Sequence, residues 1–334
     1  MNWYLQNGND SDVVLSTRIR FARNVKGFKF NLRNKEEIEE LENKIKDNLY
    51  SIGYGLKFLK LKEIDDITKM SLVEKRVISP NHVLNNNETG SILINDDENI
   101  CIMVNDGDNL KIQVFSSGLD LENTLNLGIE IDKKIEERLN YSISEKYGYL
   151  TACPSDTGTG LRCSVMLFLP GLSKTGNIRN ILEVISSFGM NVKGIYGENG
   201  DIFQISNKQT LGITENEIIQ NLKVITEKII EEERKARKFL AQDGVDLEDK
   251  IYRSYGILYN CRKISLDEAL KLLSNIKMGT DLGILDKLTD SKIQKLNLYI
   301  KPASMQQYLG NQYEPLERDI KRAEVIKQII DDNS

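Results

Sequence analysis

Three strand-like segments follow one another with very short connections, and no other feature constrains the fold as strongly. Segments 91–95 and 99–105 are apolar and are separated by the polar turn 96–98. The turn 106–109 then leads directly into segment 110–116. A parallel pair would need a crossover of about a dozen residues or more, usually through a helix. The sequence therefore predicts an antiparallel meander at the centre of the fold.

Further strand and helix patterns surround this meander. Residues 13–21 are β-branched and alternate in polarity, which predicts a strand that carries arginines. Other strands are expected on either side of a glycine-rich loop within 147–172 and of a short turn within 194–206. Helices are expected from the cap Asn34 to the stop Gly53, over 120–139, over 177–188, and from the capping box Thr214/Glu217 to about residue 242.

The composition changes near residue 245. Segment 243–250 is polar, and beyond it nearly every pattern is helical and short. We expect helices at 265–274, 281–287, 289–298 and 315–330. The predicted class is α+β, an antiparallel β-sheet flanked by helices with an α-helical C-terminal domain. The expected domains are 13–245 and 246–334.

Composition and charge exclude several classes of partner. The net charge is -5, so bulk binding to nucleic acid or to an acidic membrane is not expected. The N-terminus lacks a basic and apolar secretion signal, and no apolar run approaches the roughly 20 residues that span a bilayer. Four cysteines without a CxxC pair indicate reduced thiols and a cytoplasmic location.

Arginine is scarce, which makes its positions informative. The chain has 14 arginines against 31 lysines, so an arginine is a candidate for a site that needs a planar, bidentate donor. Arg18 and Arg20 are two residues apart and point the same way on a strand. If the meander brings them together with Lys111, Arg162 and Lys193, five cations face one cleft. That arrangement suits a polyphosphate, although solvated surface arginines are an equally ordinary interpretation.

Common catalytic signatures are missing from the sequence. There is no P-loop and no set of protein-kinase motifs, and Gly158-Thr159-Gly160 does not continue into a dinucleotide-binding pattern. The single histidine, His82, argues against a histidine-centred triad or a histidine-rich metal site. A partly buried turn histidine is the simplest interpretation of His82.

Three longer strings are more specific. VVLSTRIRFARN, LTACPSDTGTGLRCSVMLFLPGL and KGIYGENGDIFQISNKQTLG resemble, in order and spacing, the signature segments of the ATP:guanidino phosphotransferases, the phosphagen kinase family. The resemblance is closest to the bacterial protein-arginine kinase branch. The predicted sheet begins at residue 13 without the helical N-terminal domain of small-molecule guanidino kinases. A helical extension carries YRSYGIL and RDIKRA, which resembles that branch's phosphoarginine-binding motif.

The resemblance implies a glutamine-synthetase-like catalytic domain that transfers the γ-phosphate of ATP to protein arginines, with Mg²⁺ bound through the nucleotide and no metal site of the chain's own. It implies a role in bacterial stress response and protein quality control. The partners that it implies are a zinc-binding activator protein, a heat-shock repressor and a Clp-type unfoldase. It also implies a homodimer formed through the C-terminal domain.

Site residues follow from the resemblance by position. The nucleotide-binding residues would be Ser16, Thr17, Arg18, Ile19, Arg20, Lys111, Arg162, Cys163, Ser164, Val165, Met166, Lys193, Gly194, Ile195, Tyr196, Gly197 and Glu198. Glu198 would also contact the substrate guanidinium, and Cys153 would shape the substrate pocket without acting as a nucleophile. Phosphoarginine would bind Arg318, Asp319, Arg322 and Ala323.

The chain departs from the family at one catalytic position. Gly107 stands where the family has the carboxylate that orients the guanidinium and takes its proton. Asp106 or Asp108 could replace it from a neighbouring position. Lys111 and Lys193 stand where the family has arginine, and the loop after Glu198 is shorter than usual. Two functions therefore stay open: a protein-arginine kinase, or a catalytically weakened homologue that binds nucleotide or phosphoarginine as an adaptor. The absent N-terminal domain argues against a small-molecule kinase.

Overall fold

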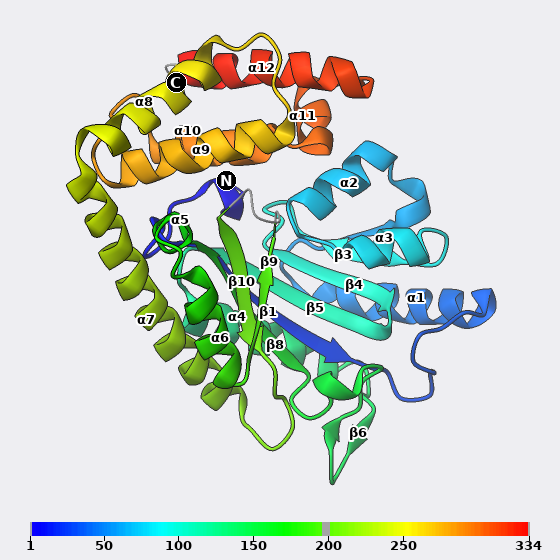
Figure 1. Cartoon of the computed structure of the whole chain (residues 1–334). Coiled ribbons are helices and arrows are strands. Elements are labelled where there is room, and N and C mark those ends of the chain that lie inside the picture. The colour runs from blue at the N-terminus through cyan, green and yellow to red at the C-terminus, as the bar shows by residue number, and fades with distance from the viewer. Residues whose placement is uncertain (1, 196–200, 333–334) are drawn as a thin grey trace.

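The structure is a computed structural model that describes residues 2–195 and 201–332. Within them, eight strands form one sheet in which every neighbouring pair is antiparallel (Figure 1). The strands are β1 (Val14–Arg23), β2 (Lys57–Lys60), β3 (Ser91–Ile94), β4 (Ile100–Asp106), β5 (Asp108–Ser117), β8 (Leu161–Phe168), β9 (Met190–Gly194) and β10 (Ile202–Asn207). Their order across the sheet is β2-β3-β4-β5-β1-β8-β10-β9. A separate hairpin joins β6 (Ile143–Ser144) to β7 (Gly148–Tyr149).

The predicted meander is confirmed, and its second turn is tighter than expected. β4 runs to Asp106 and β5 begins at Asp108, so Gly107 alone separates the two strands. Gly107 has φ +80°, a left-handed conformation that glycine adopts readily and other residues adopt at a cost.

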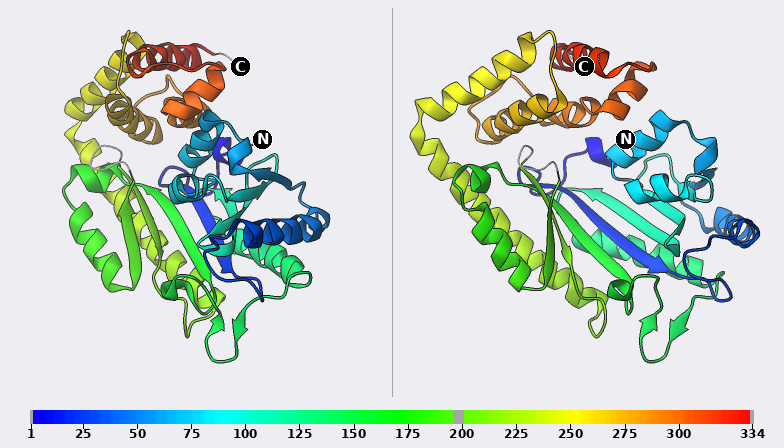
Figure 2. Two further views of the ribbon diagram at one scale, coloured as in Figure 1. Left: turned by 90° about the vertical axis from the view of Figure 1, so that its right-hand side faces the viewer. Right: turned by 45° about the vertical axis from the view of Figure 1, so that its right-hand side comes forward.

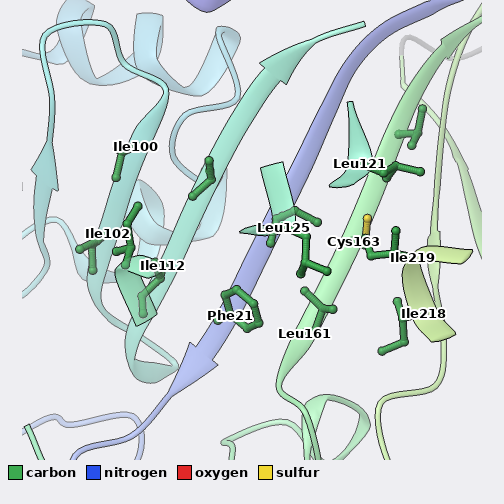
Figure 3. Close-up of a cluster of buried hydrophobic side chains, with 14 of the residues drawn as sticks. Phe21, Ile100, Ile102, Ile112, Leu121, Leu125, Leu161, Cys163, Ile218 and Ile219 are labelled. Carbon is green, nitrogen blue, oxygen red and sulfur yellow. The ribbon is translucent and has the colours of Figure 1, made fainter. Parts of the chain in front are cut away.

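One face of the sheet is covered by helices that continue the predicted patterns. These are α1 (Lys35–Leu49), α4 (Leu121–Glu136) and α7 (Glu215–Leu240). Figure 3 shows side chains from α4 and α7 packed beside Leu161 and Cys163 of β8. Asn34 caps α1, and Thr214 with Glu217 forms the capping box of α7, as expected. α5 (Pro170–Lys174) and α6 (Ile178–Ser187) lie beside this layer.

The other face of the sheet is covered only in part by a second apolar cluster. There, α2 (Asp66–Glu74), α3 (Pro80–Asn86) and the short helix η1 (Trp3–Leu5) lie over β3, β4 and β5. Neither α2 nor α3 was predicted from the sequence, because both are short and only weakly periodic. The β1, β8 and β10 part of this face carries the polar residues described below.

The C-terminal helices pack around a third apolar cluster. They are α8 (Val245–Asn260), α9 (Leu266–Asp281), α10 (Asp290–Tyr299), α11 (Pro302–Leu309) and α12 (Pro315–Asp331). Figure 2 shows them beyond the end of the sheet, close to α2 and the N-terminus. The carboxylate of Glu74 in α2 accepts hydrogen bonds from the backbone N–H groups of Ala303 and Ser304, at 2.9 and 2.7 Å.

One expectation for this region was wrong. The helix predicted at 281–287 is absent, because α9 ends at Asp281 and Gly283 takes a positive φ of +71°. The apolar residues after it pack against the helical core as an irregular segment. The polar segment near 245 is the start of α8, in which Leu247, Ile251 and Leu258 are buried at helical spacing. Across the described residues, every helix is too short or too polar to cross a lipid bilayer.

Candidate active site

β1 and β8 bring three arginines onto one face of the sheet. Arg20 is the antiparallel partner of Arg162, and Arg18 is the partner of Ser164. Residues two apart on a strand share a face, so Ser16 also lies here. We call Arg18, Arg20 and Arg162 the arginine cradle. The side chains of Arg20 and Arg162 remain 19% and 17% exposed, so a ligand can reach them.

The alternate residues of the same segments point to the opposite face. Ile19, Cys163 and Val165 are buried in the core beneath α4 and α7. The Thr17 hydroxyl donates to the carbonyl of Gly118 at 2.8 Å. These four were expected in the nucleotide site, but their side chains cannot contact a ligand on the cradle face. Of these four residues, only the backbone groups could lie near a ligand bound to the cradle.

A carboxylate absent from the sequence candidates joins two cradle arginines. Asp156 Oδ2 accepts from Arg20 Nη2 at 3.0 Å, and Asp156 Oδ1 accepts from Arg162 Nη2. Asp156 is only 5% exposed. Arg162 Nη1 also donates to the carbonyl of Asn207 at 3.0 Å, whereas Arg20 Nε is buried without a hydrogen-bond partner. Asp156 lies inside the glycine-rich segment, which was the only sequence signal for it.

The electrostatics of Arg18 differ from those of its neighbours. Its Nε donates to Ser164 Oγ at 3.2 Å. Burial, and then repulsion by Arg20, Arg76 and Arg162, lowers the pKa of Arg18 to about 9. A bound anion would oppose that shift, because it favours the charged guanidinium. Arg76, which follows α2, was not a sequence candidate.

The turn around Gly107 holds two buried carboxylates. Asp106 accepts from Lys111 Nζ at 3.0 Å and from Ser79 Oγ at 3.2 Å. Asp108 accepts from Asn24 Nδ2 at 2.8 Å and from the backbone N–H of Ala152 at 2.6 Å. Each carboxylate therefore already has a set of donors. Burial lowers the pKa of Arg20, whereas attraction by the carboxylates of Asp106 and Asp108 opposes this shift. The turn therefore lies beside the Arg20 end of the cradle.

Two further candidates lie near this turn. Cys153 is exposed, with Sγ 3.0 Å from Ser155 Oγ, and precedes the short helix η4 (Pro154–Asp156) that carries Asp156. His82 is fully buried in α3, not partly buried in a turn. Its Nε2 donates to the carbonyl of Ser91 at 3.2 Å. Its Nδ1 has no hydrogen-bond partner and lies 3.8 Å from Asp106 Oδ1, and burial lowers the pKa of the imidazole.

The third predicted nucleotide segment is only partly described. Lys193 lies exposed on β9 opposite Gln204, which in turn pairs with Met166. Pairing across antiparallel strands preserves the face, so the side chains of Lys193, Met166 and Ser16 share the cradle face. β9 ends at Gly194, and the backbone N–H of Ile195 donates to the carbonyl of Ile202 at 3.0 Å. Tyr196, Gly197 and Glu198 lie outside the described residues.

The predicted phosphoarginine residues lie apart from the sheet, on α12. Arg322 is buried and donates to the carbonyls of Ile300 and Ile264, both at 2.7 Å, and to Asp319 at 2.5 Å. Ala323 is part of the helical core. Arg318 is half-buried, and its Nε has no hydrogen-bond partner. Within residues 2–195 and 201–332, no group of three or more histidine, cysteine, aspartate or glutamate side chains is arranged to hold a metal ion.

Two family models together match most of the chain. The family model of the ATP:guanido phosphotransferase C-terminal catalytic domain matches residues 37–236, and that of the protein-arginine kinase McsB C-terminal domain matches residues 244–334. The protein-arginine kinase of Halothermothrix orenii is 43% identical over 98% of this chain and 95% of its own length. That of Bacillus pumilus is 42% identical over 98% of this chain and 92% of its own.

Solved structures share the sheet domain. The duplicated taurocyamine kinase of Schistosoma mansoni, with bound components of a transition-state analogue, aligns with a TM-score of 0.61 and 26% identity. The alignment covers 68% of this chain and 34% of that duplicated protein. Lombricine kinase aligns with a TM-score of 0.58 and 24% identity over 68% of each chain. At that identity, the second likeness supports the fold alone.

Proposed function

The chain belongs to the ATP:guanido phosphotransferase family and, within it, to the protein-arginine kinases, and we propose that it transfers the γ-phosphate of ATP to arginine side chains of proteins. The observation that carries the proposal is the arginine cradle. Three guanidinium groups lie on one face of the sheet, beside a turn that holds two carboxylates. Arginine is the side chain best suited to bidentate phosphate contacts.

The surroundings of the cradle suggest the direction in which the nucleotide lies. At the Arg18 end, a small pocket lined by Trp3, Ser16, Met166 and other side chains shares these three residues with a larger cavity of about 140 Å³. At the Arg20 end lie the turn around Gly107 and the segment that carries Cys153. The nucleoside would therefore enter at the Arg18 end, and the terminal phosphate would lie on Arg20 and Arg162, where the substrate arginine arrives.

The chemistry requires a proton acceptor at that end. A guanidinium nitrogen forms a bond to the γ-phosphorus while the bond to the bridging oxygen breaks, and ADP leaves with the bonding electrons. The attacking nitrogen loses one proton, which a carboxylate would accept. Asp108 is our first candidate for that acceptor because it lies between the turn and the Cys153 segment. Asp106 is less suited, because Lys111 already neutralises it. The proposed guanidinium contact, Glu198, lies outside the described residues.

The same activity carries a cofactor, a domain division, a cellular role and partners with it. Mg²⁺ would enter with the nucleotide, held by its phosphates. The domain boundary near residue 245 is supported by the separate apolar clusters on its two sides. A role in stress response and protein quality control rests on the resemblance alone. So do a homodimer, a zinc-binding activator, a heat-shock repressor and a Clp-type unfoldase as partners. Four unpaired cysteines favour a cytoplasmic location.

Gly107 favours a second candidate function. Without a carboxylate at this position, the chain could bind nucleotide and phosphoarginine yet transfer phosphate slowly, and act as an adaptor. The loss of general-base catalysis typically costs about 10²–10⁴-fold in rate. Under this alternative, ATP binding persists because the cradle does not depend on Gly107.

One experiment separates these functions. The purified chain is incubated with ATP, Mg²⁺ and an arginine-rich protein, and acid-labile phosphate on the protein is measured alongside ATP binding by calorimetry. A kinase gives both signals, and the weakened homologue gives binding with little or no phosphorylation. Absence of both signals would overturn both candidates.

A further inference from the structure

We propose that Asp156 is an internal counter-ion that occupies the terminal-phosphate end of the arginine cradle, so that the chain discriminates between ATP and ADP through the displacement of this carboxylate. The proposal rests on the proposed function, because it assumes that nucleotide phosphates bind the cradle. It goes further in assigning a specificity role to a residue that neither the sequence motifs nor the comparisons single out.

The geometry of Asp156 resembles that of a bound anion. Its two oxygens face two different guanidinium groups, Arg20 Nη2 at 3.0 Å and Arg162 Nη2 on the other side. The carboxylate is 5% exposed, and both arginines are mostly covered. A phosphate that took Nη2 of both arginines would need the positions that Asp156 oxygens now occupy. Ligand and carboxylate therefore compete for the same donors.

Arg20 shows that this ion pair leaves the cradle incomplete. Its Nε is buried and has no partner, although Nε and one Nη together form the fork that binds an oxyanion most strongly. Arg23, three residues along the same strand, has no such defect: its Nε and Nη2 both donate to Asp132. A purely structural ion pair at Arg20 would be expected to use the Nε as well. The unused donor fits a site whose full partner is a ligand.

The charge distribution along the cradle is uneven. The charges that act most strongly on Arg18 are positive, those of Arg20, Arg76 and Arg162. At the other end, Asp156 pairs with both Arg20 and Arg162 and so offsets part of their positive charge. The inner phosphates of any adenine nucleotide would meet the Arg18 end, where Arg18 is paired with no carboxylate of residues 2–195 and 201–332. Only the terminal phosphate of ATP would have to displace Asp156. The carboxylate therefore weakens ATP binding more than ADP binding.

The test compares ATP and ADP affinities by calorimetry on the full chain in the presence of Mg²⁺. The variant is Asp156→Asn, which keeps the shape of the side chain and removes its charge. Glu122→Gln is the matched control, because Glu122 of α4 forms an exposed ion pair with Lys223 of α7, and both helices cover the opposite face of the sheet. Asp156→Ser is a second variant in case the amide disturbs folding, and thermal unfolding of each variant reports its stability.

We expect Asp156→Asn to tighten ATP binding by about tenfold or more, the usual size of one charge-assisted contact, and ADP binding by less than about threefold. Glu122→Gln should change neither affinity. Equal tightening for both nucleotides, or weaker ATP binding in folded Asp156→Asn and Asp156→Ser, would overturn the proposal and leave the kinase assignment intact. If neither wild type nor variants bound ATP, the cradle itself would be refuted, and the proposed function with it.

Discussion

Arg20 and Arg23 lie on the same strand, yet their surroundings are opposite. Arg23 is 1% exposed and donates to both oxygens of Asp132 and to the carbonyls of Ala22 and Thr159. Its guanidinium also lies 3.6 Å from the ring centre of Tyr149. Arg20 shares one carboxylate with another arginine and keeps an unpaired Nε. Of two arginines from one strand, the fully bonded one holds the fold together and the incompletely bonded one is available for a ligand.

The largest expected effect tests the structural half of this comparison. Arg23→Ala leaves Asp132 as a buried, unpaired carboxylate, which typically lowers the free energy of unfolding by about 3–5 kcal/mol. Arg20→Ala should cost far less, because Asp156 keeps its contact with Arg162. Urea denaturation of the two variants measures the difference. Equal destabilisation by both changes would mean that hydrogen-bond saturation does not separate the two roles.

The same contrast recurs on α12, with a smaller effect. Arg322→Ala leaves the buried carbonyls of Ile300 and Ile264 without this donor, and also removes the contact with the partly exposed Asp319; unpaired buried groups cost about 1–3 kcal/mol each. We expect a loss of stability of about 2–4 kcal/mol, at the low end of that range for each group. Arg318→Ala should change stability little but weaken phosphoarginine binding, because Arg318 Nε is unpaired. Denaturation measures the stability of both variants, and titration of the full chain with phosphoarginine measures binding. If both variants bound phosphoarginine as tightly as wild type, this motif would be excluded from the binding site.

The ligand-binding half of the comparison is tested at Arg162. Arg162→Ala should weaken ATP affinity by roughly ten- to a hundredfold, since one charge-assisted contact contributes about 1.5–3 kcal/mol. Stability should change little by comparison with Arg23→Ala. Calorimetry with ATP measures the affinity, and an unchanged dissociation constant would exclude Arg162 from the nucleotide site.

The carboxylates beside Gly107 can be compared in the same way, by the donors that each already has. Asp106 and Asp108 each already accept two hydrogen bonds at one oxygen, whereas a new glutamate at 107 would begin without such donors. We expect weak phosphorylation by wild type and a rise of at least about tenfold in rate for Gly107→Glu. Because Gly107 has a positive φ, a glutamate in its place should lower the free energy of unfolding by about 1–2 kcal/mol. Gly107→Ala carries the same backbone strain without the carboxylate, so an equal rise in that control would contradict the assignment.

The smallest expected effect concerns His82, whose Nδ1 is unpaired. Burial lowers the pKa of this imidazole below its ordinary 6.5, so the unfolded chain binds more protons than the folded one as pH falls. The stabilising effect of neutral His82 is therefore present above 6.5 and declines below it, by at most about 1.4 kcal/mol per pH unit. Unfolding of wild type and His82→Gln from pH 7 to pH 5 isolates this contribution, and parallel curves would show that His82 does not titrate in this way.

Local sequence was sufficient for the parts of the fold that depend on neighbours along the chain. The turn 96–98 and the Gly107 turn are too short for crossovers, so they determined the antiparallel meander. Asn34 and the Thr214/Glu217 pair determined two helix starts, because capping is satisfied within one turn. The two-residue repeat of β1 placed Arg18 and Arg20 on one face. The separate helix predicted at 281–287 is wrong, because α9 extends to Asp281 and Gly283 then takes a positive φ.

Only the tertiary structure decided which charges meet. Asp156 is 136 residues from Arg20, and Asp132 is 109 from Arg23. These pairs exist because β1 lies between β5 and β8 in the sheet and because α4 covers one of its faces. The sequence marks each arginine as a strong donor, but its partner depends on strand order and on the layer above it. The surrounding groups then decide whether every N–H of an arginine finds an acceptor. Arg23 and Arg322 use their Nε, whereas the Nε of Arg20 and of Arg318 has no hydrogen-bond partner.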